Sequence, residues 1–117
     1  MSTPTSIRPD QLPVTIRRYL TAHVVRDADA ALRAFTPTAV VVDDGTTYRG
    51  SQEIRDFLAQ AGAEFTYTTT LVAAERTDDA HWVATNRLEG DFPGGIVDLR
   101  YRFAMDGDLI AELVISR

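Results

Sequence analysis

Residues 96–105 have the sequence IVDLRYRFAM, and the alternation within this stretch decides the fold class. Apolar or aromatic side chains take every second position, and aspartate or arginine stands between them. Such a period of two is typical of a β-strand with one buried and one exposed face. We therefore expect Val97, Leu99, Tyr101 and Phe103 to face the core, and the charged positions to face solvent or a partner.

Three further strand-like runs stand near this one in the sequence, at residues 65–75, 81–92 and 109–116. They are rich in threonine, valine and aromatic residues, which are favoured in strands. Short turns rich in aspartate and glycine join the runs, at residues 77–79, 93–95 and 106–107. Strands joined by such turns predict an antiparallel meander over the second half of the chain.

The first half of the chain has the three/four spacing of helices instead. One helix is predicted from about Gln11 to Val25. A second helix is predicted from Asp27, whose side chain can cap it, and it buries residues up to Phe35. Pro37 marks its end, because proline lacks an amide donor and restricts the residue before it.

A short strand and a third helix complete the predicted order. The apolar run 39–42 is predicted as a strand that the turn signal Asp44-Gly45 closes. Ser51 is expected to cap the third helix, and Gly62 is well placed to end it. Helices first and an antiparallel meander afterwards predict the α+β class.

Length and composition fit one globular domain. The chain has 117 residues, 44% hydrophobic and 25% charged, and we expect a single domain at 10–117 after a flexible tail at 1–9. The net charge of −5 argues against nucleic acid as a partner, and the lack of cysteine excludes disulfides and thiolate metal sites. No apolar stretch reaches the roughly 20 residues that span a bilayer. We expect a cytoplasmic protein without a membrane partner.

Several strings of residues, taken in this order and spacing, point to one family. They include IRRYL at 16–20 and RGSQEIRDFL at 49–58, which contains Gly-x-x-x-Ile-x-x-Phe, and Tyr101-Arg102-Phe103 near the end. Together they resemble the nuclear transport factor 2-like superfamily, with its SnoaL-like proteins and ketosteroid isomerases. The resemblance implies a cone-shaped α+β barrel, with three N-terminal helices packed in the concave face of a curved, mostly antiparallel sheet. It also implies a pocket inside the cone and a homodimer through the convex sheet face.

The resemblance to ketosteroid isomerases implies two catalytic residues, since their helix tyrosine falls on Tyr19 and their catalytic aspartate on Asp43. Tyr19 would donate to a developing oxyanion, and Asp43 would act as a general base. From the residues alone, Tyr19 can equally be a core side chain and Asp43 a turn residue. A one-residue slip in register would place Asp44 inside instead. The family's third site residue, a protonated aspartate, falls on Leu99.

Further side chains are expected to line the pocket, and core packing is the alternative for most of them. Asn86 is the most informative, because an amide on an otherwise apolar strand face needs a partner. The ordinary pKa of a histidine such as His23 lies near neutrality, although a helix histidine is more often part of the core. The expected pocket-lining residues are His23, Phe57, Trp82, Ala84, Asn86, Leu88, Leu99 and Tyr101.

The resemblance implies a cofactor-independent isomerase or cyclase that moves a proton on a small, apolar, carbonyl-bearing ligand. The alternative is a non-catalytic ligand-binding or dimerisation module on the same fold, which Leu99 at the carboxylate position favours. The sequence contains no metal-ligand spacing, phosphate loop or dinucleotide fingerprint, so we expect neither a metal nor a cofactor.

Overall fold

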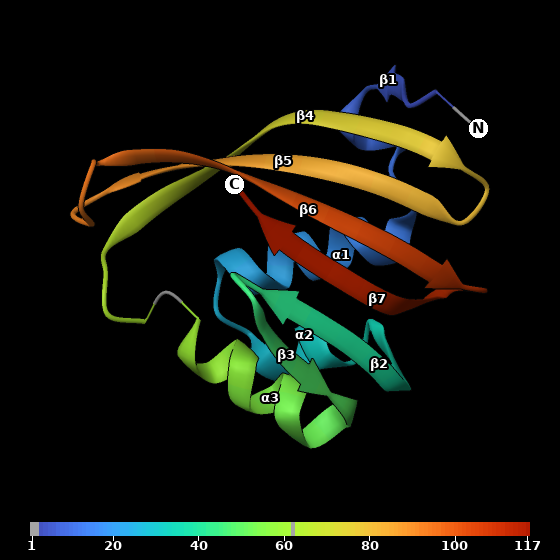
Figure 1. The fold of residues 1–117 in the computed structure, drawn as a ribbon, viewed down its shortest axis with the longest axis horizontal. Helices are drawn as coiled ribbons and strands as arrows, with labels where there is room; N and C mark the ends of the chain where they lie inside the picture. Colours follow the sequence, from blue (N-terminus) through green and yellow to red (C-terminus); the bar gives the residue numbers. More distant parts are fainter. Residues whose placement is uncertain (1–2, 62) are drawn as a thin grey trace.

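The computed structural model describes residues 3–61 and 63–117. Seven strands form a single sheet in the order β1-β4-β5-β6-β7-β2-β3 (Figure 1). The strands are β1 (Thr5–Ile7), β2 (Phe35–Asp43), β3 (Thr46–Arg49), β4 (Tyr67–Asp78), β5 (His81–Gly90), β6 (Ile96–Asp106) and β7 (Leu109–Ser116). The helices are the 3-10 helix η1 (Pro9–Gln11) and the α-helices α1 (Val14–Val24), α2 (Ala28–Leu32) and α3 (Gly50–Gln60).

The predicted meander is confirmed, because β4, β5, β6 and β7 pair in sequence order and each pair is antiparallel. The first long strand, β2, then joins the far side of β7 as a parallel neighbour. The alternation in β6 is also confirmed, since Tyr101 and Phe103 are buried whereas Asp98, Arg100 and Arg102 are exposed.

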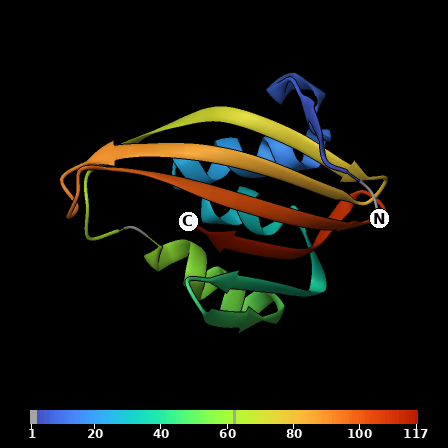
Figure 2. The same cartoon turned by 45° about the horizontal axis from the view of Figure 1, so that its top comes forward.

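The helices lie on one side of the sheet, and the long strands bow over α1 and α2 (Figure 2). The core forms in between, where Ile16 of α1, Ile54 of α3 and Leu113 of β7 are fully buried. The α+β class is therefore confirmed. The sheet is open, with β1 at one edge and β3 at the other. No helix in the described part of the chain is long and apolar enough to cross a bilayer.

The second helix is shorter than predicted. It ends at Leu32, and Phe35 instead starts β2 and pairs with Ile110 of β7. Pro37 lies inside β2, in the stretch before Val40 where the register shifts. Proline is tolerated there because an interrupted ladder needs no amide donor at that position. The prediction that Phe35 is helical is wrong, whereas its burial is confirmed.

The segment expected to be a flexible tail, residues 1–9, instead belongs to the fold from Thr5 onward. Strand β1 pairs antiparallel with the edge of β4, so that Ile7 lies opposite Ala74. The composition of residues 1–9 does not indicate this pairing, because the edge of β4 that pairs with β1 is formed by residues about 70 positions later in the chain.

The hairpin before α3 also differs from the prediction in detail. Asp44 and Gly45 both have positive φ, 49° and 83°, as the predicted tight turn requires, but the turn leads into β3, which was not predicted. Ser51 does not cap α3. The N-cap is Arg49, whose backbone amide donates to the carboxylate of Glu53 at 3.0 Å. The predicted stop at Gly62 lies outside the described residues.

Candidate functional site

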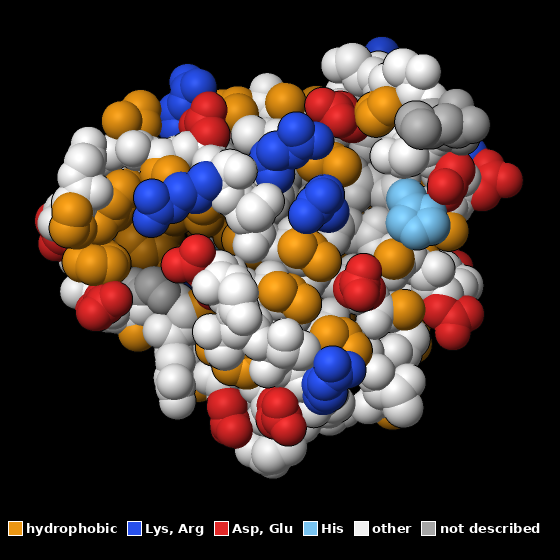
Figure 3. Space-filling view, in the orientation of Figure 1, with side chains coloured by type: hydrophobic (Ala, Val, Ile, Leu, Met, Phe, Trp, Pro, Cys, Tyr) orange, Lys and Arg blue, Asp and Glu red, His pale blue; other side chains and the backbone are white. Residues whose placement is uncertain are grey.

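A cavity of about 330 Å³ lies between the inner face of the sheet, the end of α1 and α3. This volume is within the range of about 300–1,000 Å³ that small-molecule sites occupy. Its walls are mostly apolar, with Phe57, Phe65, Phe92, Val97 and Ile115 among them. Figure 3 shows hydrophobic side chains gathered around a hollow at the end of the molecule where the β5–β6 turn projects.

Most of the residues expected to line a pocket meet in this cavity, although they come from five different elements. They are His23, Asp43, Phe57, Leu88, Leu99 and Tyr101. Trp82, Ala84 and Asn86 share the inner face of β5 with Leu88 but do not line this cavity. Distance along the strand explains this for Trp82, which lies six residues, or about 20 Å, from Leu88. Ala84 and Asn86 lie opposite the cavity residues Tyr101 and Leu99, but both are buried, and Asn86 borders a separate hollow between α1 and β4.

The structure resolves which aspartate lines the cavity. Asp43 is the last residue of β2 and lies opposite Ile115, which also borders the cavity. Asp44 is exposed in the following turn and borders, together with Asp43, the adjoining hollow at the β5–β6 turn instead of this cavity. Asp43 is half-buried, and its pKa is raised above the usual value first by desolvation and then by the negative charge of Asp44. A carboxylate with a raised pKa is a stronger base once it is ionised.

Tyr19 lies deeper than the cavity wall. It is fully buried, with its ring packed edge-on against Phe35 at 5.3 Å and Phe103 at 5.9 Å between ring centroids. Its hydroxyl has no hydrogen-bond partner among the residues that the structure describes. Burial raises the pKa of Tyr19, and the nearby Tyr101 and Asp43 raise it further. The two phenols and the carboxylate are thus close enough to interact electrostatically.

Tyr101 is the phenol that lines the cavity. Burial raises its pKa, the nearby Tyr67 and Asp43 raise it further, and the Asn86 side chain partly opposes the rise. Asn86 is itself buried close to this phenol. Both tyrosines remain protonated donors at neutral pH.

His23 is an uncharged part of the wall. Its ring is nearly parallel to that of Phe57, at 7° with the centroids 6.4 Å apart. Desolvation, followed by the positive charge of Arg26, lowers the pKa of His23 to about 4. The guanidinium of Arg26 in turn donates to the carbonyl of Ala61 at 2.8 Å and to the hydroxyl of Tyr67 at 3.1 Å, which ties α3 to β4 beside the cavity.

Several solved structures of other proteins share this architecture. No family model and no curated protein matches the sequence. A "putative polyketide cyclase" from Sinorhizobium meliloti is 28% identical, with a TM-score of 0.85, over 94% of this chain and 100% of that chain. A hypothetical protein with a ketosteroid isomerase-like fold from Catenulispora acidiphila, in complex with trimethylamine, is 19% identical with a TM-score of 0.77, over 90% and 85%. An NTF2-like protein of unknown function from Cytophaga hutchinsonii is 8% identical with a TM-score of 0.69, over 87% and 85%.

The chain has the nuclear transport factor 2-like fold. The resemblance to the nuclear transport factor 2-like superfamily is therefore confirmed for the fold. Leu99, on which the resemblance to ketosteroid isomerases placed a third site residue, lies in the cavity wall. A leucine there makes this part of the wall apolar, so the polar side of the cavity is the side that carries Asp43 and Tyr101.

Sequence reasoning missed several residues at the cavity mouth of this nuclear transport factor 2-like domain. Phe65 and Tyr67 precede or begin β4, and Phe92 follows β5. The antiparallel pairing of Tyr67 with Gly90 brings them together, and the rings of Phe65 and Phe92 meet edge-on at 6.0 Å. Aromatic residues at equivalent ends of two paired strands were a usable signal. Arg117, at the end of β7, also borders the cavity.

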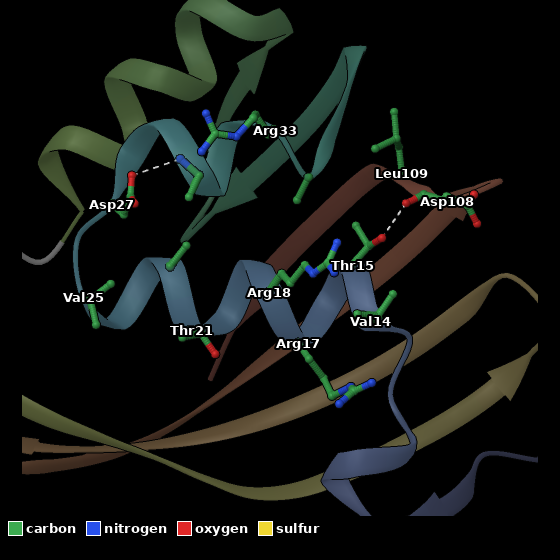
Figure 4. Close-up of a pocket in the computed structure, with 13 residues that line it drawn as sticks. Val14, Thr15, Arg17, Arg18, Thr21, Val25, Asp27, Arg33, Asp108 and Leu109 are labelled. Carbon is green, nitrogen blue, oxygen red and sulfur yellow. Dashed lines mark hydrogen bonds between the residues drawn. The ribbon is translucent and has the colours of Figure 1, made fainter.

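A second, larger hollow of about 750 Å³ lies between α1 and α2 on the outer side of the helices, opposite the sheet (Figure 4). Arg18, Arg33 and Asp108 border it, and the hydroxyl of Thr15 donates to the carbonyl of Asp108 at 2.6 Å. Its charged side chains are exposed, so water screens their effect on any ligand. The cavity under the sheet combines an apolar wall with a half-buried carboxylate, and it is the candidate site.

Proposed function

We propose that this domain binds a small, mostly apolar carbonyl compound in the cavity under the sheet and moves a proton on it, as an isomerase or cyclase of the SnoaL-like class. The observation that carries the proposal is the half-buried Asp43 with its raised pKa, beside the two protonated phenols Tyr19 and Tyr101. An acid and a base whose pKa values differ strongly, in one apolar cavity, are suited to proton transfer.

Asp43 is the base in this proposal. Its carboxylate takes a proton from the carbon next to the ligand carbonyl, and the C–H electrons form the double bond of an enolate while the carbonyl oxygen becomes negative. In an isomerisation, the protonated Asp43 returns the proton to another carbon of the conjugated system. In a cyclisation, the enolate carbon bonds to a second carbonyl of the same ligand, and the proton neutralises the resulting alkoxide.

Tyr19 and Tyr101 are the donors that stabilise the enolate oxygen. Tyr101 lines the cavity and is within reach of a ligand there. The hydroxyl of Tyr19 lacks a partner among the described residues, which costs about 1–3 kcal/mol for a buried polar group. Tyr19 lies behind the cavity wall, so a ligand oxygen would supply the missing acceptor only if the wall rearranges when the ligand binds. Donors fixed in a dry site stabilise a developing oxyanion far better than water-exposed donors do.

The same proposal includes a cone-shaped enclosure and a homodimer through the convex face. Ion pairs occupy that face of β5 and β6, where Arg87 donates to both carboxylate oxygens of Asp98 at 2.8 and 3.1 Å. Arg100 lies 3.6 Å from Glu75 of β4. A row of alternating charges is self-complementary when two copies meet about a twofold axis. Sedimentation equilibrium tests this part, and a monomer at all concentrations would contradict it.

The proposed activity is tested with 2-tetralone, an enolisable bicyclic ketone small enough for the cavity. Proton exchange at its α-carbons in D₂O is followed by NMR for the wild type, Asp43→Asn and the matched control Asp44→Asn. We expect the wild type and the Asp44 variant to accelerate exchange at pH 7 and the Asp43 variant to lose at least about a hundredfold of the acceleration. An Asp43→Asn variant as fast as the wild type would remove Asp43 from the reaction.

A second candidate function is ligand binding without turnover. It is favoured by Leu99, which makes the wall apolar at the family's carboxylate position, and by the depth of Tyr19 behind the wall. The same NMR samples separate the two functions. Binding without catalysis predicts shifts of signals from residues such as Tyr101 and Leu88 on addition of 2-tetralone, with an exchange rate equal to that in buffer.

A further inference from the structure

Arg117 borders the cavity and carries a positive charge that has no role in the proton transfer proposed above. We propose that the natural ligand is a carboxylate-bearing aromatic or conjugated carbonyl compound, whose carboxylate pairs with Arg117 while its acidic C–H lies at Asp43. The inference rests on the proposed function and names the class of substrate for it. It follows from the position of Arg117 on the sheet, from its lack of a partner, and from the aromatic side chains opposite.

The strand register places Arg117 and Asp43 on the same side of the sheet. Asp43 of β2 lies directly opposite Ile115 of β7, and Ile115 is buried against the cavity. Arg117 follows Ile115 by two positions, and alternate residues along an extended chain point to the same face. Both Asp43 and Arg117 accordingly border the cavity.

Their separation suits a ligand with two functional groups close together. Two residues along a strand and one step across to its neighbour give about 8 Å between the two α-carbons. The arginine side chain is long enough to cover most of this distance, and its end can move because the residue is exposed. A ligand whose carboxylate and acidic carbon are a few bonds apart can therefore reach both residues at once.

The guanidinium of Arg117 is available to a ligand. It forms no ion pair or hydrogen bond within residues 3–61 and 63–117, as is also true of the exposed Arg18, Arg33 and Arg102, but none of these three borders the cavity. Among the described residues that line the cavity, Arg117 is the only arginine and Asp43 has the only acidic side chain. A ligand carboxylate near Asp43 alone would be repelled, and Arg117 offsets that repulsion with a planar donor pair that matches a carboxylate.

The cavity that Asp43 and Arg117 border has a largely aromatic wall. Phe65, Tyr67 and Phe92 form one cluster, with ring centroids 6.0 and 6.5 Å from that of Phe92, and Phe57 lies on the α3 side of the cavity. Aromatic pairs prefer edge-on and offset contacts, so such a wall favours a flat, unsaturated ligand body. An acid with an aromatic ring and an enolisable ketone satisfies the wall, the base and the guanidinium together.

The test compares phenylpyruvate with 1-phenylpropan-2-one, which has a methyl group in place of the carboxylate and the same acidic benzylic carbon. Dissociation constants and benzylic proton exchange are measured by NMR for the wild type, Arg117→Gln and Arg117→Lys. Arg102→Gln is the matched control, because Arg102 is an exposed arginine on the opposite face of the sheet.

We expect the wild type to bind phenylpyruvate about 5- to 10-fold more tightly than the neutral ketone, a modest factor because Arg117 is exposed to solvent. Arg117→Gln should abolish this preference, Arg117→Lys should keep part of it, and Arg102→Gln should leave it unchanged. Salt should weaken the binding of phenylpyruvate alone. Equal binding of both ketones, or a preference that survives in Arg117→Gln, overturns the inference while the proposed function stands. If neither ketone binds or exchanges, the proposed function and the inference both fail.

Discussion

Tyr19→Phe is predicted to make the protein more stable and less active. The substitution removes one buried hydroxyl that lacks a partner among the described residues, and it keeps the ring contacts with Phe35 and Phe103. An unsatisfied buried hydroxyl costs about 1–3 kcal/mol. Because no described residue accepts from this hydroxyl, we expect a gain of about 1 kcal/mol in the free energy of unfolding. For a domain of this size that gain corresponds to a rise of about 4 °C in Tm.

The assay is urea unfolding followed by the fluorescence of Trp82, the only tryptophan and a half-buried one, together with thermal unfolding. The control is Tyr101→Phe, which removes the phenol that borders the cavity instead of the unpartnered one, and we expect no comparable gain in stability. In the exchange assay, we expect Tyr19→Phe to lose about a hundredfold, as the loss of one oxyanion donor does elsewhere. A Tyr19→Phe protein that is 1 kcal/mol less stable would show that the hydroxyl has an internal partner, and the reasoning would fail.

The remaining predictions concern ionisation and packing. The pKa of His23 is lowered from 6.5 to about 4 in the folded protein, so the uncharged ring stabilises the fold fully above pH 6.5, and this stabilisation is lost as the pH falls toward 4. In His23→Gln, the free energy of unfolding should therefore depend less on pH between 6.5 and 4 than it does in the wild type. The exchange rate should rise with pH through a midpoint above 3.8, since Asp43 must be ionised and its pKa is raised. Asp44→Asn removes the negative charge that contributes to this raised pKa, so the midpoint of its pH–rate profile should lie at lower pH. Gly90→Ala should destabilise the domain by about 2 kcal/mol or more in urea unfolding, because a Cβ there would collide with the carbonyl oxygen of Thr66. An unchanged midpoint would contradict the close approach of these two segments.

Most of the fold could be predicted because its signals are local. The alternation in 96–105 and the turns between strands are read within a few residues, and the structure has the expected strands there. The errors concern elements whose state depends on distant partners. Phe35 continues a helical pattern, but pairing with Ile110 draws it into β2, and β1 exists because the edge of β4 accepts it. Tertiary pairing overrides local preference at such positions.

The site was less predictable than the fold for a geometric reason. The pattern of the sequence assigns a residue to a face, and it does not say how far along a long strand that residue lies from the pocket. Trp82 and Leu88 share a face of β5, yet only Leu88 reaches the cavity. The sequence also left Asp43 and Asp44 as alternatives, and the pairing of Asp43 with Ile115 decides between them. Arg117 carries no pattern at all and becomes visible only once β2 and β7 are paired.

The central claim is that the cavity under the sheet holds an enolate between Asp43 and the two tyrosines. A crystal structure with 2-naphthol, a flat phenol that resembles the enolate of 2-tetralone, tests it most directly. The account predicts the naphthol oxygen within hydrogen-bond distance of Tyr101 and Tyr19, with Asp43 facing the ring edge. A naphthol bound in the hollow between α1 and α2, or bound in the cavity with its oxygen turned away from both tyrosines, would contradict it.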